Sequence, residues 1–261
     1  MFDYSQIEMR LFALLAQEYA MLEAVNNGED LHAATAIQMF GPEKYESNPK
    51  HYRRITKAIN FGIIYGMGIK ALAVALGIRV AEAQILMDEY LHRFPNVLGI
   101  QNLCKNLLYR QGYVTDFFGR RYHVEPKFAY KAVNRIVQGG AANVLKWAML
   151  QCERAITAFD LDNKVKPIIP IHDELILEVQ NDSLDYAVPR IKLAMEEIEP
   201  VLRYNSIRTL VDVEFSTTTW GAKTDYTIKP TQMDRAKCDF KNHRQQIVLP
   251  LEVPHEDWFL N

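Results

Sequence analysis

The sequence predicts an α+β protein in which a mostly helical part is joined to a small antiparallel sheet. Between residues 7 and 111, apolar residues recur at spacings of three and four, which is the period of amphipathic helices. Residues 168–179 hold two β-rich apolar runs around a polar tip, and residues 211–215 alternate apolar and acidic side chains, as antiparallel strands do. The chain has 261 residues and is 49% hydrophobic, which suffices for one large core or two smaller ones.

The composition excludes several classes of protein. The net charge of −2 gives no overall basic field, so a nucleic-acid partner would need local basic patches. The three cysteines form no CxxC motif and are odd in number, which predicts reduced thiols rather than disulfides or a zinc site. No apolar run approaches the ~18–20 residues of a membrane span, and no signal-peptide pattern is visible. We therefore expect a cytoplasmic protein without membrane contact.

The first predicted element is the end of a strand that carries Asp3. Phe2, Tyr4 and Ile7 alternate partly with polar residues, and helical spacing begins at Ile7. An acidic side chain at such a junction would face a cleft, although an N-cap or a frayed terminus is the alternative. A strand needs about five residues, so we expect this strand to be incomplete.

Two helices and a loop are predicted next. Residues 9–28 form an amphipathic helix that stops at an Asn-Asn-Gly sequence. Asp30 can cap a helix over residues 32–40. His32 lies in its first turn and suits either a capping or surface role or a ligand contact. Residues 41–50 are polar and contain two prolines, which predicts a loop.

Residues 53–68 are the stretch around which we expect the site to be built. At ~100° per residue, one helix face carries Arg53, Lys57, Asn60, Phe61, Ile64 and Tyr65. Two cations followed by a flat ring and a phenol suit a ligand with phosphates at one end and a base at the other. An ordinary amphipathic surface helix is the alternative. Gly62 and Gly66 each cost a helix about 0.5–1 kcal/mol, which indicates close approach of another group.

The middle of the chain is predicted to form further helices and one hairpin. The helices span residues 69–76, 80–93, 96–111 and 127–158, the last interrupted at Gln138-Gly139-Gly140. Residues 112–122 are typical of a β-hairpin with its turn near Gly119. Arg120 and Arg121 beside aromatic rings suit either a nucleic-acid backbone or a solvated tip. Asn134 lies one turn before Gln138 on the same helix face.

Residues 166–179 predict a tight hairpin with His172, Asp173 and Glu174 at its tip. Adjacent carboxylates repel each other unless a cation or solvent screens them. The tip is therefore either a charged site or an exposed polar turn.

The remainder is predicted as one helix, one strand and a tail. The helix spans residues 183–203 and the strand residues 211–215. The packed fold is expected to end near Trp220, and residues 223–261 to form a tail or partner-binding extension.

Asp3 and Asp173 are far apart in sequence, yet each is expected at a strand end. If the sheet brings them together, they can hold two divalent cations of the kind that promote in-line displacement at phosphorus. Mg²⁺ prefers one or two carboxylates plus substrate phosphates. Arg53 and Lys57 would then contact a triphosphate, and Phe61 would stack on a base.

Three motifs in this order carry a family resemblance. DYSQIEMRL at residues 3–11, RRITKAINFGIIYG at residues 53–66 and IHDE at residues 171–174 resemble the polymerase motifs of the family A DNA polymerases, the bacterial DNA polymerase I group. The resemblance runs from Asp3 to about Trp220. It also includes residues 30–36, 112–122 and 134–143.

The resemblance implies a right-hand architecture with mostly helical fingers and a partial antiparallel-sheet palm. Its implied divisions are palm over residues 1–12, fingers over 13–124, palm over 125–222 and a C-terminal extension over 223–261. The thumb, the upstream half of the palm and the exonuclease domain of the family are missing, so we expect no proofreading and a weak grip on duplex DNA. The implied setting is the cytoplasm of a bacterial cell or phage-infected host.

The resemblance also implies residue roles. Asp3 and Asp173 would bind two Mg²⁺ ions together with the Tyr4 carbonyl, and Lys57 would protonate the pyrophosphate leaving group. The residues implied to bind the dNTP are Gln6, Glu8, His32, Arg53, Lys57, Phe61 and Tyr65. Those implied to contact the primer–template are Arg54, Arg120, Arg121, Asn134, Gln138, His172 and Glu174. Glu8 resembles the steric gate against a ribose 2′-hydroxyl, and Tyr65 the ring that holds the templating site until the fingers close.

The implied function is template-directed DNA polymerisation from dNTPs on a primer–template, in DNA replication or repair. We expect a second chain to supply the thumb and upstream palm. Tyr130 stands where the family often has Arg, which predicts a weakened primer–template contact. The alternatives are an inactive DNA- or dNTP-binding remnant and an unrelated helical scaffold whose tail is functional.

Overall fold

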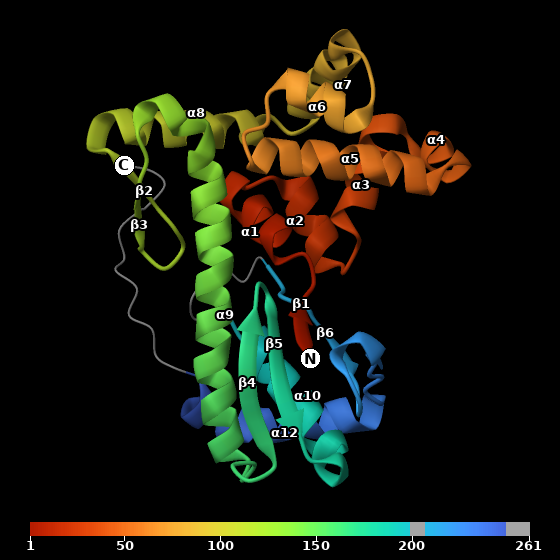
Figure 1. Cartoon of the computed structure of the whole chain (residues 1–261), viewed down its shortest axis with the longest axis vertical. Helices are drawn as coiled ribbons and strands as arrows, with labels where there is room; N and C mark the ends of the chain where they lie inside the picture. Colours follow the sequence, from red (N-terminus) through yellow and green to blue (C-terminus); the bar gives the residue numbers. More distant parts are fainter. Residues whose placement is uncertain (199–206, 249–261) are drawn as a thin grey trace. The chain divides into compact units, whose positions relative to one another are not determined.

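The computed structural model describes residues 1–198 and 207–248, which belong to two compact units (Figure 1). One unit, here called the helical unit, consists of Glu8–Gly140. The other, the sheet unit, combines Met1–Ile7 with the described residues from Ala141 onward. Among the described helices, none is both long and apolar enough to cross a membrane.

The helical unit contains most of the helices. They are α1 (Ile7–Ala16), α2 (Tyr19–Asn26), α3 (Leu31–Phe40), α4 (Pro42–Ser47), α5 (Pro49–Ile64), α6 (Ile69–Leu76), α7 (Val80–Arg93), α8 (Pro95–Gln111) and the first turns of α9 (Ala132–Ala158), preceded by the 3-10 helix η1 (Pro126–Lys131). A two-stranded hairpin pairs β2 (Tyr113–Thr115) with β3 (Arg121–His123). Helix α5 packs on α3, and α6 packs on α7.

Two predicted helix boundaries in this unit were wrong. The single helix expected over residues 9–28 is two helices, α1 and α2, because Gln17 between them has a left-handed backbone with φ +53°. The loop expected over residues 41–50 contains α4, which begins with Pro42 at a position where proline favours helix initiation. Asp30 does cap α3, and its side chain accepts a hydrogen bond from the Ala33 N–H at 2.9 Å.

Helix α9 runs through the two glycines that were expected to interrupt it. Because the two glycines have no side chains, two aromatic rings from the β2–β3 hairpin and its turn can pack directly against the helix backbone. A Cβ built on Gly139 would lie 2.0 Å from the Tyr122 hydroxyl, and one on Gly140 would lie 3.0 Å from Phe117. Glycine here serves packing and does not end the helix.

The sheet unit is built on five strands in the order β4-β5-β1-β6-β7. Their bounds are β1 (Phe2–Tyr4), β4 (Val165–Ile171), β5 (Glu174–Val179), β6 (Val211–Phe215) and β7 (Thr224–Asp225), and every pairing is antiparallel. Helices α10 (Leu184–Glu196) and α12 (Pro230–Ile247) pack against each other beside the sheet (Figure 1). The short 3-10 helices η2 (Asn181–Ser183) and η3 (Trp220–Ala222) also belong to this unit.

The strand that carries Asp3 is central in the described sheet, because β1 pairs with both β5 and β6. The packed fold also continues beyond Trp220. An ion pair joins Arg190 on α10 to Asp239 on α12, and the phenol of Tyr226 donates to Asp185 at 2.8 Å.

The helix predicted over residues 183–203 is α10, which ends at Glu196. Residues 199–206 of that prediction, and residues 249–261 of the predicted extension, lie outside the described residues.

Candidate active site

Strand β1 places Asp3 between two other acids. The sheet register pairs Asp3 with Glu174 on β5 and with Asp212 on β6. Directly paired residues direct their side chains to the same face of a sheet. Phe2 and Tyr4 are buried while Asp3 reaches solvent, because successive strand residues alternate between faces. Asp173 lies in the β4–β5 turn, where its carbonyl accepts a hydrogen bond from the Tyr4 N–H at 3.2 Å.

We call Asp3, Asp173, Glu174 and Asp212 the acidic group. The pKa of Asp3 is raised to about 6, first by partial burial and then by the negative charges of the other three. Lys223 opposes this effect. Its Nζ lies 2.5 Å from Glu214 Oε2 and 3.9 Å from Glu174 Oε1. One lysine therefore leaves the charge of the acidic group incompletely balanced.

The acidic group fits a hard divalent cation. Within residues 1–198 and 207–248, no three His, Cys, Asp or Glu side chains already have the geometry of a metal site. A cation would offset the like-charge repulsion that adds to burial in raising the pKa of Asp3. This donor set suits Mg²⁺ held by one or two carboxylates plus substrate oxygens, rather than by an all-protein cage. The Tyr4 phenol is buried and donates to the Met195 carbonyl at 2.5 Å, so only the Tyr4 backbone is available as a ligand.

Helix α5 presents an accessible stripe of two cations and two rings. Arg53, Lys57, Phe61 and Tyr65 recur at four-residue intervals, and each is at least partly exposed. Asn60 and Ile64, which were expected on the same face, are completely buried. The face is therefore narrower than predicted.

Arg53 is held in place by a neighbouring helix cap. Its guanidinium donates two hydrogen bonds to Asp30 Oδ2, at 2.6 and 2.9 Å. Asp30 also caps α3, so one carboxylate both stabilises the first turn of that helix and holds the Arg53 guanidinium in place.

His32 is buried next to the stripe and was wrongly considered for a surface or capping role. Its Nδ1 lies 3.0 Å from Asn60 Nδ2, and its backbone carbonyl accepts from Thr56 Oγ1 at 2.7 Å. Burial lowers the pKa of His32 to about 4. The negative charge of Asp30 raises this pKa, whereas the positive charges of Arg53 and Lys57 lower it. The ring is therefore neutral near pH 7 and offers a hydrogen bond rather than a charge.

Phe61 is surrounded by other rings and a cation. Its centroid lies 5.5 Å from that of His32 and 5.8 Å from that of Tyr65, to which it is nearly parallel at 16°. Lys57 Nζ lies 5.8 Å from the Phe61 centroid. This arrangement can accept a flat ligand beside a positive charge.

Tyr65 is joined to Glu8, which comes from α1. The Tyr65 phenol donates to Glu8 Oε2 at 2.6 Å, and Gln138 Nε2 lies 3.5 Å from the phenol oxygen. Burial and the Glu8 carboxylate together raise the pKa of Tyr65 to about 12. Three residues that were predicted from separate motifs therefore meet in the helical unit.

The other predicted residues lie on exposed or junctional positions. Arg120 and Arg121 lie over Tyr122 and Tyr113, with 5.6 and 4.7 Å between guanidinium carbon and ring centroid. Arg54 is exposed on α5, Asn134 is half-buried on α9, and His172 has a left-handed backbone with φ +54° in the β4–β5 turn. Gln6 also has positive φ, and its buried side-chain oxygen has no hydrogen-bond partner among the described residues.

The predicted site residues thus form two sets. Asp3, Tyr4, Gln6, His172, Asp173 and Glu174 belong to the sheet unit. Glu8, His32, Arg53, Arg54, Lys57, Phe61, Tyr65, Arg120, Arg121, Asn134 and Gln138 belong to the helical unit.

Three neighbours of these residues were not predicted as part of the site, and the first is Asp30, which was predicted only as a cap. Asn60 was placed on the ligand face and instead supports His32. Asp212 and Lys223 act on Asp3. The alternation of residues 211–215 does put Asp212 on the face opposite Val211, but its proximity to Asp3 follows only from the strand order.

A sequence profile described as DNA polymerase family A matches residues 1–222. DNA polymerase I of Rhizobium leguminosarum is 38% identical over 204 residues, which are 74% of this chain and 20% of that protein. DNA polymerase I of Pseudomonas aeruginosa is 37% identical over 204 residues, covering 74% of this chain and 22% of that protein. The chain thus spans about a fifth of the length of these curated relatives.

A solved structure resembles this chain as well. It is described as the POL domain of Pol1 from M. smegmatis in complex with DNA primer-template and dNTP. The TM-score is 0.72 at 30% sequence identity, and the match covers 80% of this chain and 38% of that chain.

Proposed function

Because this chain belongs to DNA polymerase family A, we propose that it performs template-directed nucleotidyl transfer from a dNTP to a primer 3′-hydroxyl. In this reaction the primer 3′-hydroxyl loses its proton to water as its oxygen forms a bond to the α-phosphorus, and the bond from that phosphorus to pyrophosphate breaks. The observation that carries the proposal is the sheet register, which gathers three further acids around Asp3. Partial burial and then these like charges raise the pKa of Asp3.

We propose that Asp3 and Asp173 hold two Mg²⁺ ions, with the Tyr4 carbonyl as a further ligand. When bound, the two ions stabilise the attacking and leaving oxygens of an in-line displacement. Glu174 is a supporting carboxylate, because its Oε1 is buried and its partner Lys223 lies 3.9 Å away. The acidic group contributes negative charge and position, and it does not need to transfer a proton itself.

The accessible stripe of α5 is proposed to bind the dNTP. Arg53, Lys57 and His32 would contact the triphosphate, with neutral His32 donating a hydrogen bond from its second ring nitrogen. Lys57 Nζ would give a proton to the pyrophosphate oxygen as the phosphorus–oxygen bond breaks. Phe61 would stack on the incoming base or sugar.

Glu8 and Tyr65 are proposed to select the sugar. Their hydrogen bond of 2.6 Å fixes the carboxylate, so that it can occupy the space a ribose 2′-hydroxyl would need. Gln6 lies next to this pair in sequence and is proposed to contact the same nucleotide. The proposed primer–template contacts are Arg54, Arg120, Arg121, Asn134, Gln138, His172 and Glu174.

The matched residues correspond to only part of a family A polymerase. The curated relatives are about five times longer than the matched part, and the solved POL domain has more than twice its extent. A thumb and upstream palm would add the phosphate contacts on which affinity for DNA depends. We propose that Glu8–Gly140 works as fingers and the sheet unit as palm. The free cysteines, two of them buried, are consistent with a reducing cytoplasmic setting.

Primer extension tests this function. The chain is mixed with the upstream half of a family A polymerase, and dNTP addition to a primer–template is followed with Mg²⁺ present. We expect extension that needs both polypeptides and that falls at least about 10³-fold in Asp173→Ala. If the native chain and Asp173→Ala are equally inactive but still bind dNTP, the protein is a binding remnant instead.

A further inference from the structure

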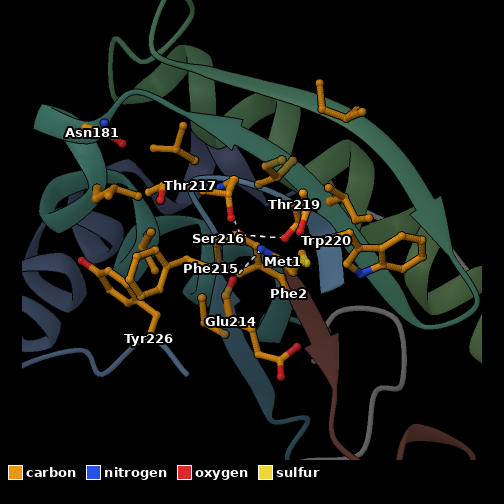
Figure 2. A pocket seen from close by; sticks show the side chains of 18 of the residues that line it. Met1, Phe2, Asn181, Glu214, Phe215, Ser216, Thr217, Thr219, Trp220 and Tyr226 are labelled. Atoms are coloured by element: carbon orange, nitrogen blue, oxygen red, sulfur yellow. Dashed lines mark hydrogen bonds between the residues drawn. The ribbon is translucent and has the colours of Figure 1, made fainter. Parts of the chain in front are cut away.

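The hairpin of β6 and β7 returns Lys223 to the side of the sheet that carries the acidic group. The two strands are antiparallel, and Glu214 on β6 lies opposite Asp225 on β7. In the turn between them, Ser216 Oγ donates a hydrogen bond of 2.7 Å to the Thr219 carbonyl (Figure 2). Lys223 directly precedes β7. The hairpin therefore places a cation next to the acidic residues of β6.

The sheet register gathers carboxylates on the face that Lys223 reaches. Asp3 lies opposite Glu174 on one side and opposite Asp212 on the other, and directly paired residues share a face. Glu214 follows Asp212 by two positions on β6, so it lies on this face as well. Three neighbouring strands thus each present at least one acid to the same surface.

Lys223 forms ion pairs with two of these acids. Its Nζ lies 2.5 Å from Glu214 Oε2 and 3.9 Å from Glu174 Oε1. Glu174 Oε1 is buried and has no hydrogen-bond partner among the described residues. The charge of Lys223 also lowers the pKa of Asp3, against the acids that raise it.

The Lys223 side chain is accessible enough to change its position. It is 34% exposed, and a lysine ammonium is a compact charge on a flexible stem of four carbons. Its hydrogen bond to Glu214 raises the pKa of Lys223, so the ammonium stays charged at neutral pH. Lys223 is therefore a movable positive charge at the edge of the acidic group.

Given the metal-binding role proposed above for the acidic group, we propose that Lys223 is an internal counter-cation, which competes with divalent metal ions for these carboxylates and sets their metal affinity. A divalent ion brings two positive charges to the carboxylates that Lys223 already partly neutralises. Because like charges repel at such separations, the ion binds either against the repulsion of Lys223 or after the lysine has moved away from Glu174.

A purely structural role of Lys223 predicts the opposite change in metal affinity. If the lysine only holds Glu174 and Glu214 in place, its removal loosens the carboxylates and weakens metal binding. If the lysine competes with the metal, its removal leaves more uncompensated negative charge and strengthens metal binding. The profile of the polymerase family ends at residue 222, directly before Lys223, so the family match does not itself assign this role.

Mn²⁺ binding to the full chain tests the proposal. Free and bound Mn²⁺ are measured by electron paramagnetic resonance at low ionic strength, without dNTP. Lys223→Met keeps an unbranched side chain but removes the charge, and we expect it to bind Mn²⁺ at least about threefold more tightly than the native chain. Lys223→Arg keeps the charge and should bind like the native chain. The gain in Lys223→Met should shrink in high salt, because salt screens partly exposed charges.

Lys241→Met, which removes an exposed lysine on α12, is the matched control and should leave Mn²⁺ affinity unchanged. Circular dichroism confirms that the variants are folded. The proposal is overturned if Lys223→Met binds Mn²⁺ with native or lower affinity, if neither it nor the native chain binds Mn²⁺, or if Lys223→Arg or Lys241→Met gains as much. Equal affinity of the native chain and Asp3→Asn would contradict the metal site itself, and with it this role of Lys223.

Discussion

At the scale of single residues, Asp3 is the side chain whose chemistry depends most on its neighbours. Partial burial and then the negative charges of its three acidic neighbours raise the pKa of Asp3 to about 6, so folding disfavours the ionised form that is present at neutral pH. The free energy of keeping Asp3 ionised in the folded state is therefore unfavourable, at the position where the proposed function requires several negative charges close together. Such a conflict between stability and charge is typical of functional sites.

Replacement of Asp3 by a neutral residue is expected to stabilise the fold. At pH 7.5 without divalent cations, Asp3→Asn should raise the free energy of unfolding by about 1 kcal/mol, a value kept small because the side chain reaches solvent. The gain should shrink as the pH falls from 6 towards 4, since folded Asp3 then takes up a proton and its repulsion disappears. Urea unfolding at several pH values measures this.

Asp234→Asn, an exposed carboxylate on α12, serves as the control and should change stability little at any pH. A native-like or lowered stability of Asp3→Asn at pH 7.5 would show that the acidic group does not repel as its pKa indicates.

The hydrogen bond from Tyr65 to Glu8 carries a second prediction. Tyr65→Phe keeps the ring but removes the donor, and a hydrogen bond to a charged group is worth about 1.5–3 kcal/mol. Glu8 would then move, so discrimination between dNTP and rNTP should fall about tenfold or more. The ratio of their incorporation efficiencies, measured with the upstream half supplied, gives the result. Tyr109→Phe, on an exposed ring of α8, is the control, and an unchanged ratio in Tyr65→Phe would remove Glu8 from sugar selection.

At the scale of elements, the end of α5 depends on one glycine. Gly66 has φ +67°, and a Cβ there would lie 2.5 Å from the Tyr130 carbonyl oxygen. Gly66 therefore follows the helix and turns the chain, although it was expected to lie within the helix. The close approach predicted from the two glycines is present, and the neighbour is the backbone of Tyr130.

Gly66→Ala should lower the free energy of unfolding by about 1–3 kcal/mol, because it combines a left-handed backbone with a clash. Gly99→Ala, in the exposed interior of α8 where a Cβ meets nothing within 4 Å, should instead raise it by about 0.5–1 kcal/mol. Urea unfolding of the two variants should therefore show opposite signs. Equal effects would mean that the turn at Gly66 is not strained by a side chain.

Helix bounds were predicted best where a glycine or a proline marks the end of one helix or the start of the next. Helices α6 and α7 have the predicted bounds, because Gly77 takes a left-handed C-cap and Pro95 starts the next helix. The continuity of α9 could not be predicted, since it depends on rings from a distant hairpin that fill the space beside Gly139 and Gly140. Tertiary contacts of this kind override local preferences.

The family was predictable from the motifs, because their resemblance to family A polymerases is confirmed by the match over residues 1–222. The roles of Asp3, Lys57 and Phe61 in a site remain predictions. The partners that set the properties of the site were not predictable, because Asp212 reaches Asp3 through strand order and Asp30 reaches Arg53 through helix packing. The proposed site residues belong to short sequence motifs, whereas the residues that surround them come from distant parts of the sequence.

At the scale of the whole molecule, the family match and the described fold differ in extent. The match ends at residue 222, while β7 and α12 continue the sheet unit beyond it. Arg244 on α12 donates to Glu197 at 2.6 Å, and His243 packs against Phe159 with centroids 5.2 Å apart. Residues 223–248 are therefore part of the packed unit, in contrast to the tail that was expected.

The central claim is that Asp3 and Asp173, 170 positions apart in the chain, hold metal ions together. Binding of Mn²⁺, followed by electron paramagnetic resonance in the presence of a dNTP and in competition with Mg²⁺, tests it most directly. We predict that Asp3→Asn and Asp173→Asn each weaken Mn²⁺ binding at least about tenfold, a loss of about 1.4 kcal/mol, whereas Asp234→Asn binds like the native chain. Equal Mn²⁺ affinity in all four proteins would contradict the account.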